Sequence, residues 1–355
     1  MKKHCYGLAI VGFGGMGSQH ARTLEPVEEI RLIGTYDILA ARQLAARELG
    51  YETFDSFEHL LEDVRVDIVL IATPNHLHKE LSILAMEAGK HVICEKPVTL
   101  NADELLQIIA VSERTGQLFS IHQNRRWDED FRMVKKVYEE GQIGKIWSIE
   151  SRVMGSQGIP GDWRTKKEFG GGMLLDWGIH LADQLLWLLP EQITKVYCKL
   201  GYLLGGECDD NVKLYLSFES GIEALVEVGA WNMESLPRWY VNGMDGTMTV
   251  RDFWFKKGSI TRLTADVKNN TKPINAGKGI TKTMAPRHMD TVEMMELPRV
   301  TTDVRDYYRN FTKAISGTEA LIVTPEQALR VMRLMDIARL SARQDQVLPF
   351  ETEAD

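Results

Sequence analysis

The sequence lacks the features that mark several classes of protein. Its four cysteines form no C-x-x-C pair and no metal-ligand spacing, so we expect free thiols in a reducing compartment and no disulfide framework. It has no block of Lys or Arg and carries a net charge of −8, which argues against a dedicated nucleic-acid or anionic-membrane surface. No stretch approaches the roughly 18 apolar residues of a membrane helix. We therefore expect a cytoplasmic protein whose partners include neither nucleic acid nor membrane.

The length and composition are those of an ordinary globular enzyme-sized chain. The 355 residues suggest two domains. With 44% hydrophobic and 26% charged side chains, each domain has enough apolar surface to form a sizeable core. A change of pattern after His122 places the predicted boundary, with one domain at residues 1–122 and the other at 123–355.

Residues 1–122 are predicted to form a doubly wound parallel sheet. Short apolar runs alternate with helical segments, and Asp67–Ala72 is almost continuously apolar, as a strand buried on both faces should be. Alternation at this spacing is typical of an α/β domain with helices on both faces of the sheet. The predicted strands are Tyr6–Val11, Ile30–Thr35, Asp67–Ala72, His91–Cys94 and Leu118–His122, and the predicted helices are Ser18–Leu24, Ala40–Leu49, Leu77–Ala88 and one from Asn101 to Thr115.

A glycine-rich turn follows the first strand and predicts a dinucleotide site. Gly12, Gly14 and Gly17 give G-x-G-x-x-G at a strand-to-helix joint, where glycines allow a tight turn, approach of a pyrophosphate and close helix packing. Asp37 ends the next strand, 20 residues after Gly17. A carboxylate there accepts hydrogen bonds from ribose hydroxyls and repels a 2′-phosphate, which favours NAD over NADP. A methyltransferase-type nucleotide site shares this pattern but does not account for the motifs that follow. The predicted cofactor contacts of this turn are Gly12, Phe13, Gly14, Gly15, Met16, Gly17 and Asp37.

Two further segments lie where strands end, at the sheet edge that binds ligands in such folds. Thr73 and Asn75 follow one strand, with His78 able to contact the cofactor or to brace the next helix. Glu95 and Lys96 follow another, before Pro97, and with Thr73 and Asn75 they are further predicted cofactor contacts. A lysine held there would reach into the cleft beside the nicotinamide, and the Lys96–Pro97 bond can be cis or trans. His76-x-His78 lacks a convincing third ligand, so no metal is expected.

The second half reads as an α+β domain with a large, mostly antiparallel sheet. A helix is predicted through Val134–Glu140, residues 265–298 are predicted to be a turn-rich loop or lid, and the last helices are expected to be able to pack back on the first domain. An antiparallel sheet leaves one face free for a partner, which favours a homodimer or a higher homo-oligomer. The predicted strands are Ile146–Val153, Ile193–Leu203, Val212–Phe218, Ile222–Ala230 and Trp239–Asn242, and the closing helices are Thr301–Ser316 and Pro325–Arg343.

The glycine triplet Gly170–Gly172 leads into a predicted helix that carries Asp176 and His180. A spacing of i, i+4 puts both side chains on one helix face, where a carboxylate can orient an imidazole that acts as a general base. We interpret the triplet as bare backbone that lets substrate and nicotinamide come close. Before it, Trp163 and Arg164 offer a stacking face and a fork of donors that suit a polyol or sugar.

These motifs, in this order, resemble the glucose–fructose oxidoreductase, inositol dehydrogenase and rhizopine-catabolism (Gfo/Idh/MocA) family over essentially the whole chain. The resemblance implies a Rossmann domain for NAD and a catalytic trio of Lys96, Asp176 and His180 between the two domains. It implies oxidation of a secondary hydroxyl of a sugar, inositol or derivative, or reduction of the corresponding ketone. The run Gln123–Trp127 is similar to a subgroup with scyllo-inositol and glycoside 3-dehydrogenases. The implied substrate contacts are Lys96, Asn124, Arg125, Trp163, Arg164, Asp176 and His180.

The same residues suit hydride-transfer chemistry. Neutral His180, oriented by Asp176, can take the hydroxyl proton near physiological pH, while a protonated Lys96 stabilises the developing alkoxide. Two alternatives stay open. One is redox-assisted cleavage of a glycoside with NAD recycled, and the other is a regulatory protein that binds NAD without turnover.

Overall fold

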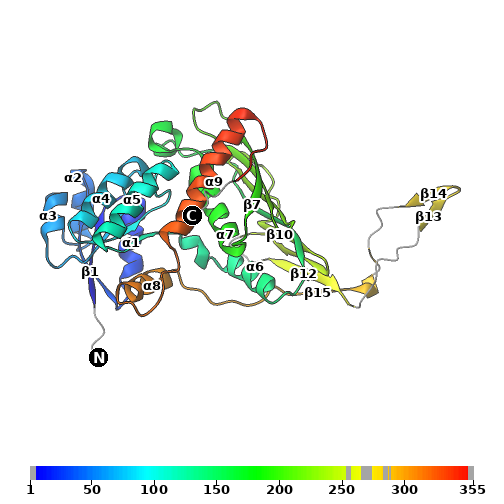
Figure 1. Cartoon of the computed structure of the whole chain (residues 1–355), viewed down its shortest axis with the longest axis horizontal. Coiled ribbons are helices and arrows are strands. Elements are labelled where there is room, and N and C mark those ends of the chain that lie inside the picture. Colours follow the sequence, from blue (N-terminus) through cyan, green and yellow to red (C-terminus); the bar gives the residue numbers. More distant parts are fainter. Residues whose placement is uncertain (1–4, 253–256, 265–273, 283–286, 288, 351–355) are drawn as a thin grey trace.

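The computed structural model describes residues 5–252, 257–264, 274–282, 287 and 289–350. Figure 1 shows two sheets with a layer of helices between them: a smaller sheet near the N-terminus, and a larger one on the far side of helices α6 (Glu129–Glu139), α7 (Ile179–Leu188) and α9 (Pro325–Gln344). The fold class predicted from the sequence, a parallel α/β sheet followed by an α+β unit with a mostly antiparallel sheet, is confirmed.

The smaller sheet has five parallel strands in the order β2-β1-β3-β4-β5. Each strand coincides with a predicted apolar run, and all four residues of β3 are buried, as expected for a strand covered on both faces. The order reverses between β1 and β3, which creates a crevice at their carboxyl ends. The strands are β1 (Tyr6–Val11), β2 (Ile30–Tyr36), β3 (Ile68–Ile71), β4 (His91–Cys94) and β5 (Phe119–Ile121).

Five helices belong to this sheet, and four of them overlap predicted helices, although α1 begins at Gly15 and not at Ser18. The Asn101 side chain accepts a hydrogen bond from the Glu104 amide at 2.9 Å, so Asn101 caps the start of α5. Helix α3 was not predicted, because its six residues are too few to show a helical period. The helices are α1 (Gly15–Leu24), α2 (Ala40–Glu48), α3 (Phe57–Glu62), α4 (His78–Glu87) and α5 (Ala102–Thr115).

The larger sheet has the strand order β15-β12-β11-β10-β6-β9-β8-β7. Its neighbours are antiparallel except β6 and β9, which are parallel. Strand β8 alternates buried and more exposed residues, so one face meets the helices and the other is open. The strands are β6 (Ile146–Met154), β7 (Ile193–Gly201), β8 (Asn211–Phe218), β9 (Glu223–Gly229), β10 (Trp239–Gly243), β11 (Gly246–Val250), β12 (Gly258–Leu263) and β15 (Val292–Met295).

The prediction of a turn-rich loop at 265–298 is wrong in part. Strand β15 pairs with β12, and β13 (Ile274–Gly277) with β14 (Ile280–Lys282) makes a hairpin that Figure 1 draws away from the body. The segments are short, and residues 274–282 turn after four residues, so neither gave a clear period-2 pattern. Residues 265–273, 283–286 and 288 lie outside the described part of the chain.

The last two helices connect the two halves of the molecule. Helix α9 packs against α5, and Asp336 accepts a hydrogen bond from the Ala102 amide at 2.8 Å. Helix α8 (Asp306–Ile315) begins five residues later than predicted, and its Tyr307 and Tyr308 contact the first sheet region through Ser120 and His20.

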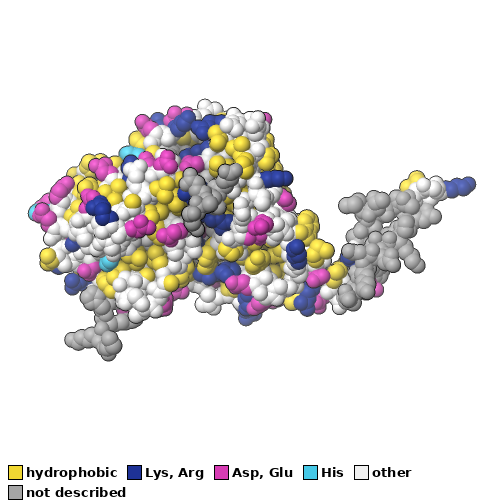
Figure 2. Space-filling view, in the orientation of Figure 1, with side chains coloured by type: hydrophobic (Ala, Val, Ile, Leu, Met, Phe, Trp, Pro, Cys, Tyr) yellow, Lys and Arg dark blue, Asp and Glu magenta, His cyan; other side chains and the backbone are white. Residues whose placement is uncertain are grey.

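The surface shows no concentration of one charge on the face drawn in Figure 2, where basic and acidic side chains are interspersed. Among the described residues, no helix has both the length and the apolar composition that crossing a bilayer requires.

Candidate active site

The glycine turn after β1 has the shape of a dinucleotide loop. Gly12 has φ +91°, and a Cβ there would lie 2.6 Å from the Ala72 carbonyl oxygen. A Cβ on Gly17 would lie 1.9 Å from the Gly12 carbonyl oxygen, so the first and last glycines are required by the protein's own packing. Gly15 has no atom within 4 Å of its Cβ position, which leaves this side of the turn open to a ligand.

Asp37 closes this turn from the end of β2. Its carboxylate accepts the Phe13 amide at 2.7 Å and the Leu39 amide at 2.9 Å, and Arg42 approaches it at 3.3 Å. The Asp37 side chain is buried, whereas Arg42 is about half exposed. The predicted acid therefore lies beside the glycine loop, and the half-exposed guanidinium of Arg42 lies next to it.

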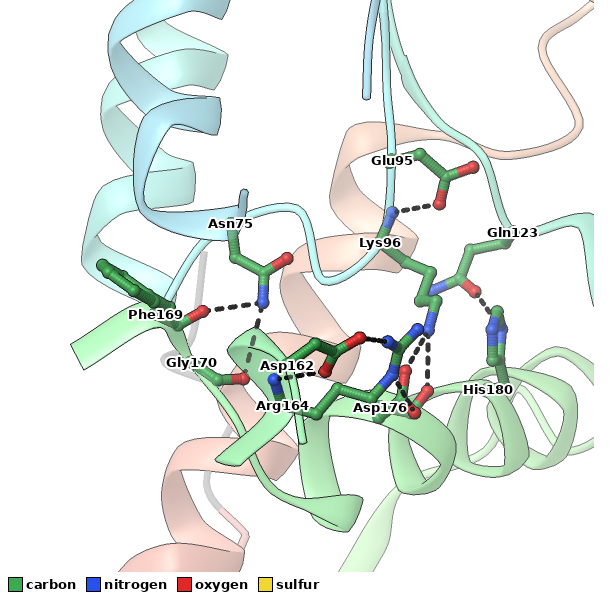
Figure 3. A network of polar contacts seen from close by, with 10 residues as sticks. All are labelled: Asn75, Glu95, Lys96, Gln123, Asp162, Arg164, Phe169, Gly170, Asp176 and His180. Atoms are coloured by element: carbon green, nitrogen blue, oxygen red, sulfur yellow. Dashed lines mark hydrogen bonds and ion pairs between the residues drawn. The ribbon is translucent and has the colours of Figure 1, made fainter. Parts of the chain in front are cut away.

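The residues after β3 face the same crevice. The Thr73 hydroxyl oxygen is buried and has no hydrogen-bond partner among the described residues, so a polar group of a bound ligand would satisfy it. Together with the open side at Gly15, this orphaned hydroxyl fits a nicotinamide dinucleotide at the predicted place. Asn75 donates to the carbonyl oxygens of Phe169 at 2.9 Å and Gly170 at 3.4 Å, as Figure 3 shows.

His78 braces the loops. Its ring is fully buried, with Nδ1 2.9 Å from the Pro97 oxygen and Nε2 2.9 Å from the Thr73 oxygen. The sequence left open whether His78 contacts the cofactor or braces a helix, and its contacts are those of a brace. The Lys96–Pro97 bond that it supports is cis.

Lys96 and Asp176 come together from positions 80 residues apart. The Lys96 ammonium group donates to Asp176 Oδ1 at 2.9 Å and to the Asp176 carbonyl oxygen at 2.8 Å. Arg164 donates to the other carboxylate oxygen of Asp176 at 3.1 Å. Burial opposes ionisation of Asp176, but the charges of Lys96 and Arg164 outweigh it and hold the pKa of this carboxyl below its usual value. Asp176 is thus an anion that fixes two cations.

The prediction that Asp176 orients His180 is wrong. Asp176 lies in a π-helical turn, Leu174–Gly178, and His180 lies in the α-helix that follows. The Asp176 carboxylate is bound to Lys96 and Arg164 instead of to the imidazole. Within the described residues, the hydrogen-bond partner of His180 Nδ1 is Gln123 Oε1, at 3.2 Å.

His180 is held as a neutral imidazole. Its ring is buried, and burial followed by the charges of Lys96 and Arg125 holds the pKa of His180 well below its usual range. If Nδ1 donates to Gln123, then Nε2 is unprotonated and able to accept a proton. This is the state a general base requires.

Two hollows beside these residues have space for a small molecule. They measure about 460 and 420 Å³ and share Val153, Met154 and Trp177. The larger is also lined by Arg164 and Asp176, and the smaller by Arg125. The predicted contacts Arg125, Arg164 and Asp176 are therefore at the hollows, while Asn124 lies in the same short helix as Arg125 and Trp163 in that of Arg164.

The aromatic rings near the hollows stack on cations. The Arg125 guanidinium lies 4.2 Å from the centre of the Trp177 ring, and that of Arg164 lies 4.6 Å from the Trp163 ring. Such pairs keep the guanidinium groups flat against a ring and directed along it. Trp177 was not predicted as a site residue, although it stands between Asp176 and His180 in the sequence.

Glu95 was predicted to contact the cofactor, but its carboxylate bonds elsewhere. Oε1 is 2.8 Å from His20 Nε2 and 2.7 Å from His122 Nδ1. His20 Nε2, His122 Nδ1 and Glu95 Oε1 all lie within 4.8 Å of one another, close enough to share a metal ion. The sequence gave no sign of this group, because its three members lie on separate elements.

The glycine triplet serves packing and not the approach of a ligand. A Cβ on Gly172, which has φ +104°, would lie 2.2 Å from Asp209 Oδ1. Asp209 in turn accepts the Leu174 amide at 2.7 Å and so holds the start of the π-helical turn. Our interpretation of the triplet as bare backbone for substrate is therefore replaced, and Asp209 is a supporting residue that the sequence did not reveal.

Comparisons with known proteins agree with this architecture. Residues 6–123 match the family model described as "Oxidoreductase family, NAD-binding Rossmann fold", and residues 131–249 match the "GFO/IDH/MocA C-terminal domain". A scyllo-inositol 2-dehydrogenase (NADP(+)) of Bacillus subtilis is 26% identical over 97% of this chain and 96% of its own. A 2,7-anhydro-N-acetylneuraminate hydratase of Escherichia coli is 31% identical over 68% of this chain and 66% of its own. The crystal structure of an NAD-binding protein from Listeria innocua is 42% identical, with a TM-score of 0.88 and coverage of 98% of this chain and 97% of that one.

Proposed function

The chain belongs to the Gfo/Idh/MocA family of NAD-binding oxidoreductases, and we propose that it moves a hydride between NAD and a secondary hydroxyl, or the corresponding ketone, of a sugar, glycoside or inositol. Residues 1–122 hold the cofactor and residues 123–355 the substrate. The observation that carries the proposal is the meeting of Lys96 with Asp176, near the neutral His180, where Asp176 also lines the larger hollow.

The proposed roles follow from the contacts. His180 takes the hydroxyl proton on Nε2, oriented by Gln123 and not by Asp176. Lys96, anchored by two bonds to Asp176, directs its remaining N–H toward the substrate oxygen and stabilises developing negative charge. Bound NAD supplies the hydride chemistry, and its contacts would be the Gly12–Gly17 turn, Asp37 and Thr73. Arg164 and Arg125 offer donors to the other hydroxyl groups.

The first test separates chemistry from cofactor binding. In the variants Lys96→Met and His180→Asn we expect turnover to fall by roughly 10²–10⁴-fold, while the Kd for NAD stays close to that of the parent protein. Lys90→Met is the matched control, since Lys90 precedes β4 as Lys96 follows it, and its ammonium group likewise donates to protein oxygens, the carbonyl groups of Asp63 and Val66. Near-normal oxidation by either site variant would refute the role given to that residue.

NAD is the proposed cofactor in preference to NADP. The buried carboxylate of Asp37 beside the glycine turn supports this choice, because it would meet a ribose 2′-phosphate with like charge. The variant Asp37→Ser removes that charge and leaves Arg42, so the ratio of kcat/KM for NAD to that for NADP should fall by at least about tenfold. A parent enzyme that already prefers NADP would overturn the assignment.

The substrate class is a polyol. Stacking rings and guanidinium forks at the two hollows support this, since they offer flat apolar faces and directed donors together. A panel of inositols, sugars and glycosides, assayed with each cofactor for formation of the reduced nicotinamide, would identify the substrate. Activity confined to simple alcohols or to hydroxy acids would contradict it.

A second candidate reaction is redox-assisted cleavage or hydration with NAD recycled. The name of the hydratase that is 31% identical supports keeping this alternative, because a hydratase has no net redox change. The two reactions differ in stoichiometry. A dehydrogenase accumulates one reduced cofactor for each ketone, whereas the alternative releases product and accumulates none.

A homodimer or higher homo-oligomer is also proposed, through the open face of the large sheet. Trp147 on β6 and Tyr215 on β8 are about half exposed there, and exposed rings on a sheet face are typical of interfaces. Light scattering of the parent protein and of Trp147→Ser tests this. A monomeric parent would refute it.

A further inference from the structure

Four buried polar side chains, one of them the neighbouring Glu95, form a closed ring of hydrogen bonds next to Lys96. His20 comes from α1, Glu95 from the end of β4, His122 from the end of β5 and Tyr308 from α8. All four are at most 5% exposed. The chemistry proposed above does not use them, although Glu95 is the neighbour of Lys96 in the chain.

The contacts run around the ring. Glu95 Oε1 is 2.8 Å from His20 Nε2 and 2.7 Å from His122 Nδ1. The Tyr308 hydroxyl is 2.6 Å from His20 Nδ1 and 3.3 Å from His122 Nε2. Each histidine thus has one ring nitrogen on the carboxylate and the other on the phenol, which makes four contacts in all.

Counting protons shows that neutral side chains do not fill this ring. Two neutral histidines and a phenol supply three N–H or O–H protons. One proton from each histidine points to Glu95, which leaves the Tyr308 proton to serve two ring nitrogens. The shorter contact, to His20 Nδ1, takes it. His122 Nε2 would then face the phenol oxygen without a proton, in a buried place where such an unmade bond is costly.

We propose that His122 carries a proton on both ring nitrogens and forms with Glu95 a buried imidazolium–carboxylate pair that positions Lys96. With this fourth proton, His122 donates to Glu95 and to the Tyr308 oxygen, and Tyr308 donates to His20. Every polar atom of the ring is then satisfied, and the pair has no net charge, which is the condition for burying ions.

The neighbours of the pair support this proton placement. Burial, and then the charge on His122, lower the pKa of His20, which keeps His20 neutral. Burial opposes ionisation of Glu95, but His122 and then His20 hold its pKa well below the usual value. Burial raises the pKa of Tyr308 well above its usual range, so the phenol keeps its proton. Tyr307 packs edge-on to the His122 ring at 4.9 Å.

Two consequences reach the proposed site. The second oxygen of Glu95 accepts the Lys96 amide at 3.0 Å, so the pair fixes the backbone from which the lysine extends (Figure 3). The positive charge on His122 also cancels that of Glu95 near His180, where an unbalanced carboxylate would favour the protonated imidazole. The role of His122 as a positioning residue rests on the proposed function, whereas the protonation state of His122 does not.

The same three atoms could instead bind a divalent metal. In that case the metal would replace the protons between Glu95 and the two histidines. Glu95 Oε1 lies 2.7 Å from one histidine nitrogen and 2.8 Å from the other, and these are hydrogen-bond distances. We therefore favour protons between these atoms, and a bound metal is an outcome of the test.

The deciding experiment is ¹⁵N NMR of the histidine rings in the intact protein at pH 7, with metal analysis of the same sample. We expect both ring nitrogens of His122 to be protonated and less than about 0.1 equivalent of metal. His91 is the internal control, since its Nδ1 accepts the Leu118 amide at 3.0 Å and so carries no proton. The signal is assigned by its loss in His122→Asn or, if that variant does not fold, by its shift in Tyr308→Phe. A singly protonated His122, or one equivalent of bound metal, would overturn the proposal.

Kinetics test the link to the active site. In His122→Asn we expect kcat to fall roughly tenfold, the Kd for NAD to change less than about twofold, and the acid limb of kcat/KM to move up by about one pH unit. A role confined to folding would lower activity without moving this limb, and an unmoved limb overturns the link. If Lys96→Met and His180→Asn prove active while the NMR result holds, the proposed function fails and the imidazolium–carboxylate pair stands.

Discussion

Replacing Gly172 by alanine tests how the π-helical turn that carries Asp176 is supported. The residue has φ +104°, where an L-residue is strained by about 1–2 kcal/mol. Its Cβ would also lie 2.2 Å from Asp209 Oδ1 and 2.9 Å from the Asp209 carboxyl carbon. Both atoms cannot stay in place, so Asp209 must move away from the Leu174 amide that it now accepts at 2.7 Å.

The magnitude follows from these two terms. Loss of a buried hydrogen bond to a charged group costs about 1.5–3 kcal/mol, and the lower entropy of the unfolded alanine chain returns about 0.4–1 kcal/mol. Gly172→Ala should therefore lower the free energy of unfolding by about 2–4 kcal/mol. It should also reduce turnover, because the displaced π-helical turn carries Asp176.

The assay compares this variant with Gly221→Ala. Gly221 has φ +87° and no atom within 4 Å of its Cβ position, so it carries the backbone strain alone. Urea unfolding of both variants should show Gly172→Ala to be less stable by about 2 kcal/mol. If the two variants lose the same stability within about 0.5 kcal/mol, the contact with Asp209 does not support the helix and the reasoning is refuted.

Two further predictions concern stability. Burial raises the pKa of Asp209 to about 6, above the ~3.9 of an unfolded chain, so the folded protein binds this proton more tightly. The free energy of unfolding of the parent protein should therefore fall by about 3 kcal/mol, relative to that of Asp209→Asn, as pH rises from about 4 to 6. Urea titrations of both proteins at both pH values test this, and equal changes in the two proteins would contradict it. Thr324 caps α9 in a reciprocal pair with Gln327, so Thr324→Ala should lose about 1 kcal/mol. Thr324→Ser should keep most of the stability that the cap provides. Equal losses of stability in Thr324→Ala and Thr324→Ser would argue against the cap.

The parallel half of the fold could be predicted because its pattern is local. Each strand is a short apolar run closed by a turn signal, and β3 is buried along its whole length. The edge of the larger sheet was missed because β11, β12 and β15 have five, six and four residues and mix polar with apolar positions. Their pairing depends on partners distant in the sequence, which a period alone does not identify.

The site was predictable where a motif fixes both a residue and its place. Lys96 follows the end of strand β4, and Asp176 follows the glycine triplet that precedes its helical segment. These two signals fixed the places of the residues, and the structure brings them within hydrogen-bond distance. The relation of Asp176 to His180 was predicted wrongly, since the spacing indicates a shared helix face but cannot show that Lys96 and Arg164, from other segments, bind the carboxylate. The partnership of His20 with Tyr308 joins residues 288 positions apart, and no local pattern marks it.

The bonds from Asn75 to Phe169 and Gly170 link the nucleotide crevice to the segment that leads to Asp176. Asn75 stands where the cofactor is proposed to lie, yet its amide holds the Phe169 and Gly170 carbonyl groups, and the His76 ring stacks on Phe169 at 4.8 Å. An occupant of the nucleotide crevice that steadies this loop would also steady the segment that leads to Asp176. By thermodynamic reciprocity, each ligand must then tighten the binding of the other by the same factor. Whichever ligand binds first, the affinity for the second is raised by this factor.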